Sequence, residues 1–230
     1  GAGMALWYCA GGTISGCVIT NNMAIPAAAN TPAYGGGIGL RYCVIAVNDV
    51  LLQGNTANAI GSGESYGGGL YMYCSVVVLG NCVVKNNLVT SVSGISYGGG
   101  IGVDASKIST SVLRDTVVAN NRTKGGYGGG IYNSSSACLL TNCLVTGNST
   151  QGGSGDGFYG EANTFTLNNC TVAHNAGTGI ARGNGILTNS IVWGNGDDLG
   201  ASGWTASHTD IEDGDYNGIN GCFSSDPIFE

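Results

Sequence analysis

The sequence of 230 residues predicts an all-β fold, a right-handed single-stranded parallel β-helix of about seven rungs with an irregular C-terminal segment. Three observations predict it. One motif recurs seven times, two of its columns are wholly aliphatic, and almost all variation in repeat length falls at one place. We therefore expect a repeat domain over residues 1–195 and an acidic irregular segment or cap over residues 196–230.

Each copy of the motif ends on an asparagine, which serves to align the copies. These anchor residues are Asn22, Asn55, Asn87, Asn121, Asn148, Asn175 and Asn195. Identical polar side chains on successive rungs of a stack can hydrogen-bond to one another and satisfy the polar groups of a turn in place of water. We expect the anchors to form such a ladder.

Two columns counted back from the anchor indicate the core. The position three residues before it holds Ile19, Leu52, Val84, Val118, Val145, Val172 and Val192. The position eight residues before it holds Ile14, Val47, Leu79, Leu113, Leu140, Leu167 and Leu187. The small residues five positions before the anchor share a face with the first column, because side chains alternate along a strand. Both columns are predicted to face inward.

The corners of each rung follow from residues that tolerate left-handed backbone. Six positions before the anchor stand Gly16, Asp49, Asn81, Asp115, Asn142, Asn169 and Asn189. Upstream, glycine runs such as Gly98–Gly100 and Gly128–Gly130 precede a third strand. Each repeat is thus predicted to form three short strands, two tight corners and one variable corner. The connection at the variable corner shortens from twelve residues to one along the chain, so its long loops should form a ridge.

The start of the sequence predicts self-association. Residues 5–9 resemble residues 70–74, which leaves the first rung uncovered. An open end of a β-helix presents unpaired backbone groups that pair readily with another chain. We expect head-to-tail association into a fibre. The alternatives are a fragment of a longer β-helix and an isolated monomer.

The nine cysteines contain no Cys-x-x-Cys pair, which argues against a zinc or redox motif. They follow the repeat instead. Cys143 and Cys170 are predicted to be neighbours on successive rungs, and Cys9, Cys43 and Cys74 to form a second column. An odd total leaves at least one thiol unpaired within the chain.

Charge excludes two classes of partner. Charged residues make up 9% of the chain, and the net charge is −7. Residues 196–230 contain eight acids and no base, while the rest of the chain has seven bases and six acids. No positive stripe for nucleic acid or an anionic membrane can form, and no apolar run is long enough for membrane insertion. A surface rich in Ser, Thr, Asn and Gly is typical of an extracellular or cell-surface protein.

Residues 128–132 (Gly-Gly-Gly-Ile-Tyr) and the Cys-x-Val-x-x-Asn cadence over residues 143–148 carry a family resemblance. The pattern resembles the repeats of polymorphic outer-membrane proteins and related bacterial surface β-helices, within the pectate-lyase-like superfold. Residues 226–229 are similar to the closing segment of such domains. The resemblance implies the fold and leaves lyases, hydrolases, tailspikes and adhesins as possible functions.

Candidate sites are few. Asp213, Asp215 and Asn217, followed by Gly218, match the first half of a calcium loop, whose second half is missing, so they are candidate calcium ligands or an ordinary acidic turn. We predict no other cofactor. The Asp197-Asp198 pair lacks the companion His and Arg motifs of polygalacturonase-like enzymes.

Two further patterns predict no active site. Gly-x-Ser-x-Gly occurs at residues 63–67 and 94–98, at loop ends rather than at a strand-to-helix elbow. The isolated His174 and His208 are expected at the surface.

The sequence therefore predicts a non-enzymatic structural or adhesive β-solenoid, a filament subunit or adhesin stalk with possible contacts to surface glycans. The rival hypothesis is a carbohydrate-binding or polysaccharide-degrading β-helix. It would require a groove lined by aromatic and acidic residues along one sheet. The tyrosines before the glycine runs could stack on sugars or pack at the corner: Tyr34, Tyr66, Tyr97 and Tyr127.

Overall fold

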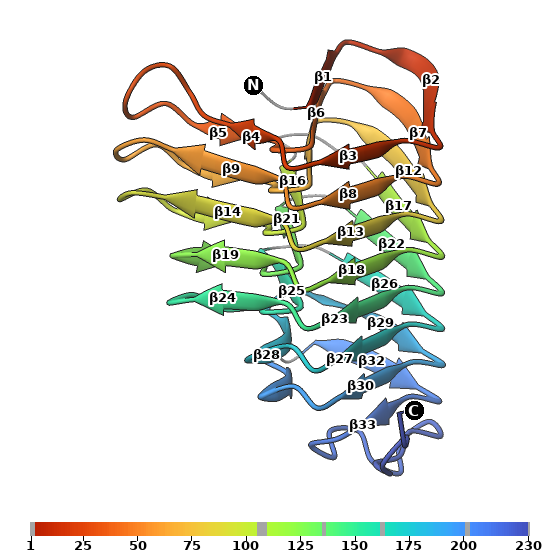
Figure 1. Ribbon diagram of the computed structural model, residues 1–230. Coiled ribbons are helices and arrows are strands. Elements are labelled where there is room, and N and C mark those ends of the chain that lie inside the picture. Colours follow the sequence, from red (N-terminus) through yellow and green to blue (C-terminus); the bar gives the residue numbers. More distant parts are fainter. Residues whose placement is uncertain (1–2, 105–109, 135–136, 162–163, 201–202, 230) are drawn as a thin grey trace.

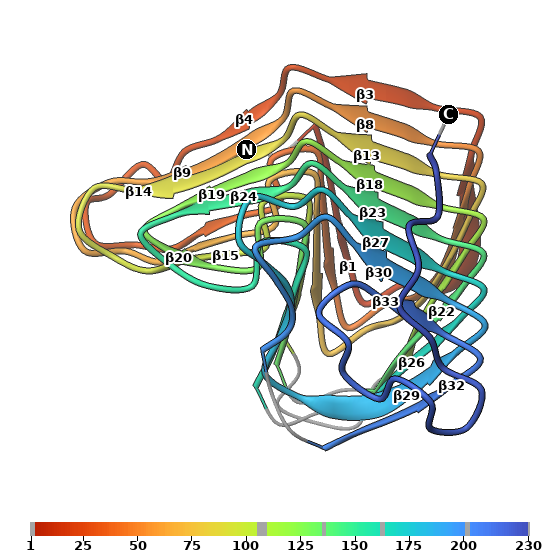
Figure 2. The ribbon, with the colours of Figure 1, turned by 90° about the horizontal axis from the view of Figure 1, so that it is seen from below.

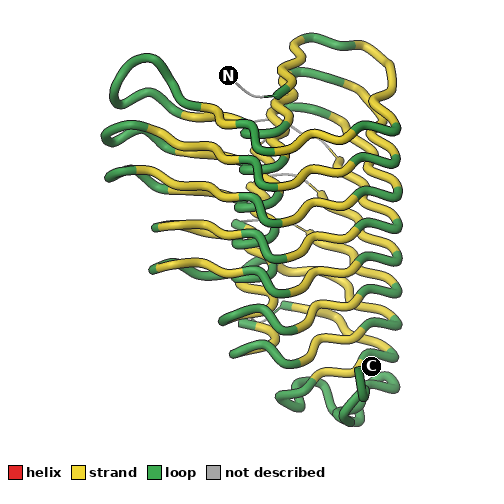
Figure 3. Tube along the Cα trace, viewed as in Figure 1, coloured by secondary structure: helices red, strands yellow, loops and turns green. Residues whose placement is uncertain are grey.

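The computed structural model describes residues 3–104, 110–134, 137–161, 164–200 and 203–229, and it confirms the predicted parallel β-solenoid. All paired strands of the described residues are parallel, and the secondary structure consists of strands and loops (Figure 3). Three eight-stranded sheets wrap around the core, and sheets of five and four strands form an arm on one side (Figures 1 and 2). We name these sheets A, B, C, D and E.

The strands of each sheet stack in chain order. Sheet A contains β1 (Met4–Trp7), β6 (Ile38–Arg41), β11 (Leu70–Tyr73), β16 (Ile101–Asp104), β21 (Ile131–Ser134), β25 (Phe158–Gly160), β28 (Thr178–Ala181) and β31 (Asp197–Leu199). Sheet B contains β2 (Ala10–Ser15), β7 (Val44–Asn48), β12 (Val76–Gly80), β17 (Thr110–Arg114), β22 (Ala137–Thr141), β26 (Thr164–Asn168), β29 (Asn184–Thr188) and β32 (Trp204–Ser207). Sheet C contains β3 (Val18–Thr20), β8 (Leu51–Gln53), β13 (Val83–Lys85), β18 (Val117–Ala119), β23 (Leu144–Thr146), β27 (Thr171–Ala173), β30 (Ile191–Trp193) and β33 (Asp210–Ile211).

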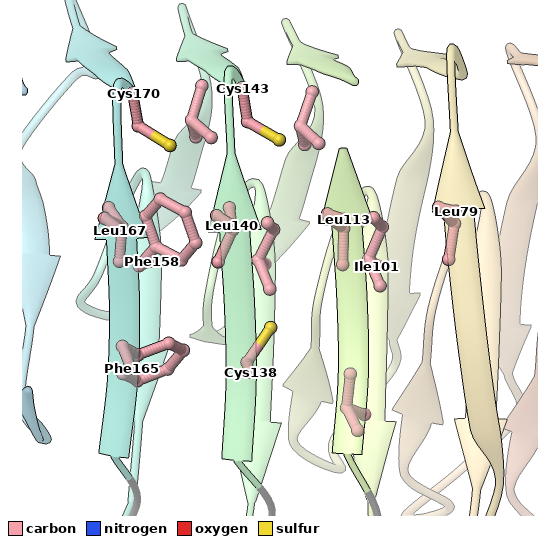
Figure 4. Close-up of a cluster of buried hydrophobic side chains, with 14 of the residues drawn as sticks. Leu79, Ile101, Leu113, Cys138, Leu140, Cys143, Phe158, Phe165, Leu167 and Cys170 are labelled. Carbon is pink, nitrogen blue, oxygen red and sulfur yellow. The ribbon is translucent and has the colours of Figure 1, made fainter. Parts of the chain in front are cut away.

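The core contains the two predicted aliphatic columns. From the second turn onward, both columns are at most 1% exposed, as at Leu113 and Val145. The inner residues of sheet A, such as Ile101 and Phe158, face them across the interior (Figure 4). This burial supplies the main stabilisation of the coil, at about 25 cal/mol for each Å² of apolar surface removed from water.

The corner between sheets B and C has the predicted left-handed backbone. All seven residues six positions before the anchors have φ between 50° and 59°, with Asp115 and Asn189 at the lower value and Gly16 at the upper. At the opposite corner Gly98 has φ of 68°, and a Cβ on Gly99 would collide with the carbonyl oxygen of Gly129. Glycine is required there because the backbones of successive turns approach closely.

The anchor asparagines form the predicted ladder. Each side-chain amide donates Nδ2–H to Oδ1 of the next anchor, with Nδ2–Oδ1 distances of 2.9 to 3.1 Å from Asn22 to Asn195. The same Oδ1 accepts the backbone N–H of the preceding anchor at 2.9 to 3.0 Å. The ladder thereby satisfies polar groups at a corner that is buried from water.

The long connections lie together along one side of the coil as predicted, but they form paired strands instead of a ridge of loops. They leave the coil in sheet D and return in sheet E, and these two sheets make the arm (Figure 2). Sheet D contains β4 (Met23–Ala24), β9 (Thr56–Ala59), β14 (Leu88–Ser91), β19 (Arg122–Lys124) and β24 (Ser149–Gln151). Sheet E contains β5 (Ala33–Tyr34), β10 (Ser65–Tyr66), β15 (Ser96–Tyr97) and β20 (Gly126–Tyr127). Connections of similar length on adjacent turns lie one strand spacing apart, so their backbones pair.

The first turn is displaced by one residue from the predicted alignment. Met4, and not Ala5, shares a register with Ile38 and Leu70. The second cysteine column therefore continues from Cys9 and Cys43 to Ser75, whose hydroxyl accepts the backbone N–H of Cys43 at 3.0 Å. Cys74 instead lies at the left-handed corner, with φ of 45°. A register shift in β2 between Ala10 and Thr13 adds a residue there and explains the error.

The acidic C-terminal segment continues the coil before it becomes irregular. Within residues 196–230, β31, β32 and β33 add one strand each to sheets A, B and C, so each main sheet has eight strands rather than about seven. The aliphatic and small residues of β31 to β33 extend the core, with Ile211 and Ala206 at most 1% exposed. Turns and extended chain follow.

Candidate functional site

The residues proposed as calcium ligands lie in the turns after β33. The carboxylate of Asp213 accepts two backbone N–H groups, from Asp215 at 3.1 Å and from Asp198 at 3.3 Å. The backbone N–H of Asn217 donates to the carbonyl of Gly214 at 3.0 Å. In the described part of the chain, no group of three or more His, Cys, Asp or Glu side chains could hold a metal ion. Calcium binding remains a prediction.

Other candidate residues from the sequence analysis take part in packing and in hydrogen bonds of the fold. Ser65 and Ser96, the central residues of the Gly-x-Ser-x-Gly patterns, are fully buried in sheet E. The Ser65 hydroxyl accepts the N–H of Ala59 and donates to the carbonyl of Thr90. His174 lies at a left-handed turn with its ring 5.3 Å from the ring of Phe229. None of these side chains forms a nucleophile with a base.

A pocket of about 360 Å³ lies where the arm joins sheet A, at the N-terminal end of the coil. Its floor is the outer face of sheet A, and its walls come from the arm and from the last residues of β1, β6, β11 and β16. Four aromatic and two charged side chains line it: Trp7, Tyr34, Tyr71, Tyr73, Arg41 and Asp104. Small apolar residues complete the lining, among them Ala5, Ala33, Pro26 and Pro32.

The pocket is hollow because small residues occupy the floor. Ala5, Gly39 and Tyr71 are in register on adjacent strands, and all face outward from sheet A. A Cβ on Gly39 would meet only the carbonyl oxygen of Tyr34, at 3.8 Å. Farther along the same column, Tyr132 and Tyr159 are at most 4% exposed and fill the space beneath the arm. The hollow is therefore confined to the first turns.

Stacked tyrosines form the boundary between arm and coil. In sheet E, the ring of Tyr66 lies 5.6 Å from Tyr34 and 4.7 Å from Tyr97, measured between centroids. The ring of Tyr71 on sheet A lies 4.9 Å from Tyr34 and 5.4 Å from Tyr66. Such pairs add about 0.5–1.5 kcal/mol each beyond their burial. They fix the arm against the coil and hold the wall of the pocket in place.

The four predicted corner tyrosines thus have two roles. Tyr97 is 9% exposed and packs against Tyr132, with 4.6 Å between ring centroids, and Tyr127 packs against Tyr159 at 4.5 Å. Tyr34 is 41% exposed and lines the pocket. Corner packing accounts for most of this column, whereas the ring of Tyr34 is partly exposed at the pocket.

Carboxylates hold the tyrosine hydroxyls at the edge of this boundary. Asp104 accepts hydrogen bonds from the hydroxyls of Ser134 at 3.2 Å and Tyr71 at 3.4 Å. Glu64 accepts the hydroxyl of Tyr66 at 2.7 Å. Burial, followed by these negative charges, raises the pKa of both tyrosines well above the ordinary value. The hydroxyls therefore stay protonated and act as donors at all physiological pH values.

Arg41 contributes a positive charge held over aromatic rings. Its guanidinium carbon lies 4.7 Å from the ring centroid of Tyr73 and 5.5 Å from those of Trp7 and Tyr42. Its buried Nε atom has no hydrogen-bond partner among the described residues. These cation–π contacts hold the guanidinium at the pocket, which Arg41 lines.

Sequence reasoning missed this group of residues. No prediction from the sequence connects Arg41 with Trp7, Tyr73 or Asp104. The signal is present in the third strand of each repeat, because Trp7, Arg41, Tyr73 and Asp104 occupy the same register position on adjacent strands. The opposing wall could not be foreseen while the long connections were interpreted as loops.

No family model, curated protein or solved structure significantly matches the chain. The described residues also contain no helix of the length and hydropathy needed to cross a membrane.

Proposed function

We propose that the chain is an extracellular or cell-surface adhesive β-solenoid that binds a glycan in the pocket between the arm and sheet A. The observation that carries the proposal is the pocket lining, in which Trp7, Tyr34 and Tyr73 surround a space that also contains Arg41 and Asp104. A pocket lined by aromatics and an acid along one sheet is the feature that the carbohydrate-binding hypothesis required.

The pocket fits the chemistry of a sugar ring. A pyranose has apolar C–H faces, which aromatic rings can cover, and a rim of hydroxyls, which need donors and acceptors. Asp104 supplies an acceptor and Arg41 supplies donors at the same pocket. The volume of about 360 Å³ lies at the lower end of the range for ligand pockets, about 300–1,000 Å³, and suits one or two sugar residues.

The lining favours binding over hydrolysis. A glycoside hydrolase generally uses two carboxyl groups that flank the scissile bond. Asp104 is the only Asp or Glu among the described residues that line the pocket, and its carboxylate accepts the Ser134 and Tyr71 hydroxyls. We therefore propose a non-enzymatic role.

The rigid coil suits an adhesive or stalk-like role. The asparagine ladder and stacked core repeat from turn to turn, and a solenoid of this kind extends its binding surface by adding turns. The resemblance of its repeats to those of polymorphic outer-membrane proteins supports a surface location. Head-to-tail self-association stays part of the proposal, and the exposed Tyr8 and Val18 of the first turn, at 72% and 71%, are residues outside the pocket that a second copy could cover.

The experiment is a glycan-array screen followed by titration monitored by tryptophan fluorescence. We expect binding to one class of glycan, lost in Trp7→Ala and kept in Trp193→Ala. Trp193 is a matched control because its half-buried side chain lies on sheet C, away from the pocket. An array without binding would refute the proposal. Release of new reducing ends from the bound glycan would show the enzymatic alternative instead.

A further inference from the structure

The chemistry around Arg41 suggests what kind of sugar the pocket selects. Building on the proposed glycan binding, we infer that the preferred ligand is a pyranose with an anionic substituent, a carboxylate or a sulfate. Arg41 pairs with the anion, and Asp104 binds hydroxyls at the far side of the same ring. Three features support this inference: the aromatic rings that hold Arg41, the N–H group of Arg41 that lacks an acceptor, and the positions of the other charges.

Arg41 is held in a fixed position by its neighbours. Trp7, Arg41 and Tyr73 are in register on β1, β6 and β11, so the guanidinium lies between two aromatic side chains. Guanidinium-to-ring distances of 4.7 Å to Tyr73 and 5.5 Å to Trp7 indicate cation–π contacts with both. A long side chain restrained in this way loses less conformational entropy when it binds a ligand.

One donor of the restrained guanidinium lacks an acceptor. Nε of Arg41 is buried and has no hydrogen-bond partner among the described residues. A charged group with an unpaired donor gains from additional charged acceptors at its accessible N–H groups. The planar N–H edge matches two oxygens of a carboxylate or sulfate, which it binds more strongly than the hydroxyls of a neutral sugar.

The surrounding charge permits an anion at this end of the pocket. Among the described residues, three charged side chains lie at or near the pocket: Arg41 and Asp104 line it, and Glu64 accepts the hydroxyl of Tyr66, whose ring stacks on Tyr34. Asp49 lies at the corner between β7 and β8, where sheets B and C meet and not where the arm joins. The seven acids among the described residues 196–200 and 203–229 lie at the opposite end of the coil (Figure 1). Asp104 would repel an anion, so it orients the ligand with the anionic group toward Arg41.

The test is isothermal titration with matched sugars. Methyl glucoside, glucuronate and glucose 6-sulfate share one ring and differ in charge, and the corresponding galactose series covers the other common stereochemistry. We expect at least one anionic sugar to bind ten-fold or more tightly than its neutral counterpart, with affinity falling as salt rises. The comparison of glucuronate with the sulfate distinguishes the two anions.

Substitution separates this inference from the proposed function. Arg41→Gln keeps hydrogen-bonding capacity and removes the charge, so it should reduce the anionic preference to within about two-fold and leave neutral binding. Arg114→Gln, at an exposed position on sheet B, should leave the preference unchanged. Equal affinity for neutral and anionic sugars, or a preference that survives Arg41→Gln, would overturn the inference while glycan binding stands. If the protein binds none of these sugars and no glycan of the array, the proposed function itself is overturned.

Discussion

The side-chain amide of Asn195 donates a hydrogen bond to the carboxylate of Asp198, with 2.9 Å between Nδ2 and Oδ1. This contact ends a ladder that runs through all seven anchor asparagines. The other carboxylate oxygen of Asp198 accepts the backbone N–H of Glu212 at 2.8 Å. Each earlier asparagine of the ladder donates its Nδ2–H to the next anchor toward the C-terminus. The last asparagine therefore needs a hydrogen-bond acceptor, and a carboxylate supplies one.

Asp198 should make stability depend on pH. Burial, partly offset by the Asn195 hydrogen bond, raises its pKa from 3.8 to about 6, and the charge of Asp213 adds to the rise. The folded state therefore binds this proton more tightly than the unfolded state, and the free energy of unfolding should increase as pH falls from 8 through 6 to 4.5. The gain is at most about 3 kcal/mol.

Urea unfolding of Asp198→Asn across that range checks the prediction. The difference in unfolding free energy between the original protein and the variant should grow toward acid pH. Asp49→Asn is the control, because Asn81 already occupies the equivalent corner of the next turn. A difference that stays constant with pH would show that Asp198 does not titrate in this window.

The middle of the ladder should be more sensitive than its start. The Asn121 side chain accepts two hydrogen bonds from Asn87 and donates to Val84 and Asn148, all within 3.0 Å. Asn121→Ala leaves buried groups unpaired and should cost about 3–5 kcal/mol. Asn22→Ala, at the partly buried first rung, should cost about 1 kcal/mol. Equal costs in thermal unfolding would contradict a cooperative buried ladder.

The core columns set the register of the coil. Val145 is fully buried on β23, while Thr146 faces outward on the same strand. Val145→Asp should destabilise the fold by about 4 kcal/mol or more, because it buries a charge without a partner. Thr146→Asp should change stability by less than about 1 kcal/mol. If both variants unfold at the same temperature as the original protein, the inward assignment of this column is wrong.

Cysteine reactivity should report burial. Cys143 and Cys170 lie on successive turns as predicted, and both are reduced and buried (Figure 4). Burial raises the pKa of Cys138 to about 12, which suppresses its reactive thiolate. Under native conditions a thiol reagent should modify the partly buried Cys9, Cys17 and Cys74 first. The remaining thiols should react only in denaturant, which mass spectrometry of the labelled peptides can follow.

The sequence predicted the coil because the same physical constraint repeats on every turn. Alternation along each strand marks Val118 and Leu113 as inward, and left-handed corners select Asp115 or Asn142. Features that differ between turns were harder to predict. The register shift near Gly11 displaced Cys74, and the arm has a core of small residues such as Ala57 and Ala59 that carry a weak apolar pattern.

The pocket belongs to this second group. It exists because Ala5 and Gly39 interrupt a column that continues as Tyr71, and because the arm encloses the gap. The first condition is visible in the aligned repeats. The second depends on the strands of sheets D and E, which could not be foreseen while the long connections were interpreted as loops.

Filling the pocket tests the central claim most directly. Gly39→Leu places a side chain on the floor, where the nearest atom to the new Cβ is the Tyr34 carbonyl oxygen at 3.8 Å, so the coil should fold with unchanged thermal stability. The measurement is the affinity of Gly39→Leu for the glycan that the original protein binds, by isothermal titration. The account predicts that binding is lost or weakened at least a hundred-fold, whereas a folded Gly39→Leu protein that binds with the original affinity would show that this pocket is not the binding site.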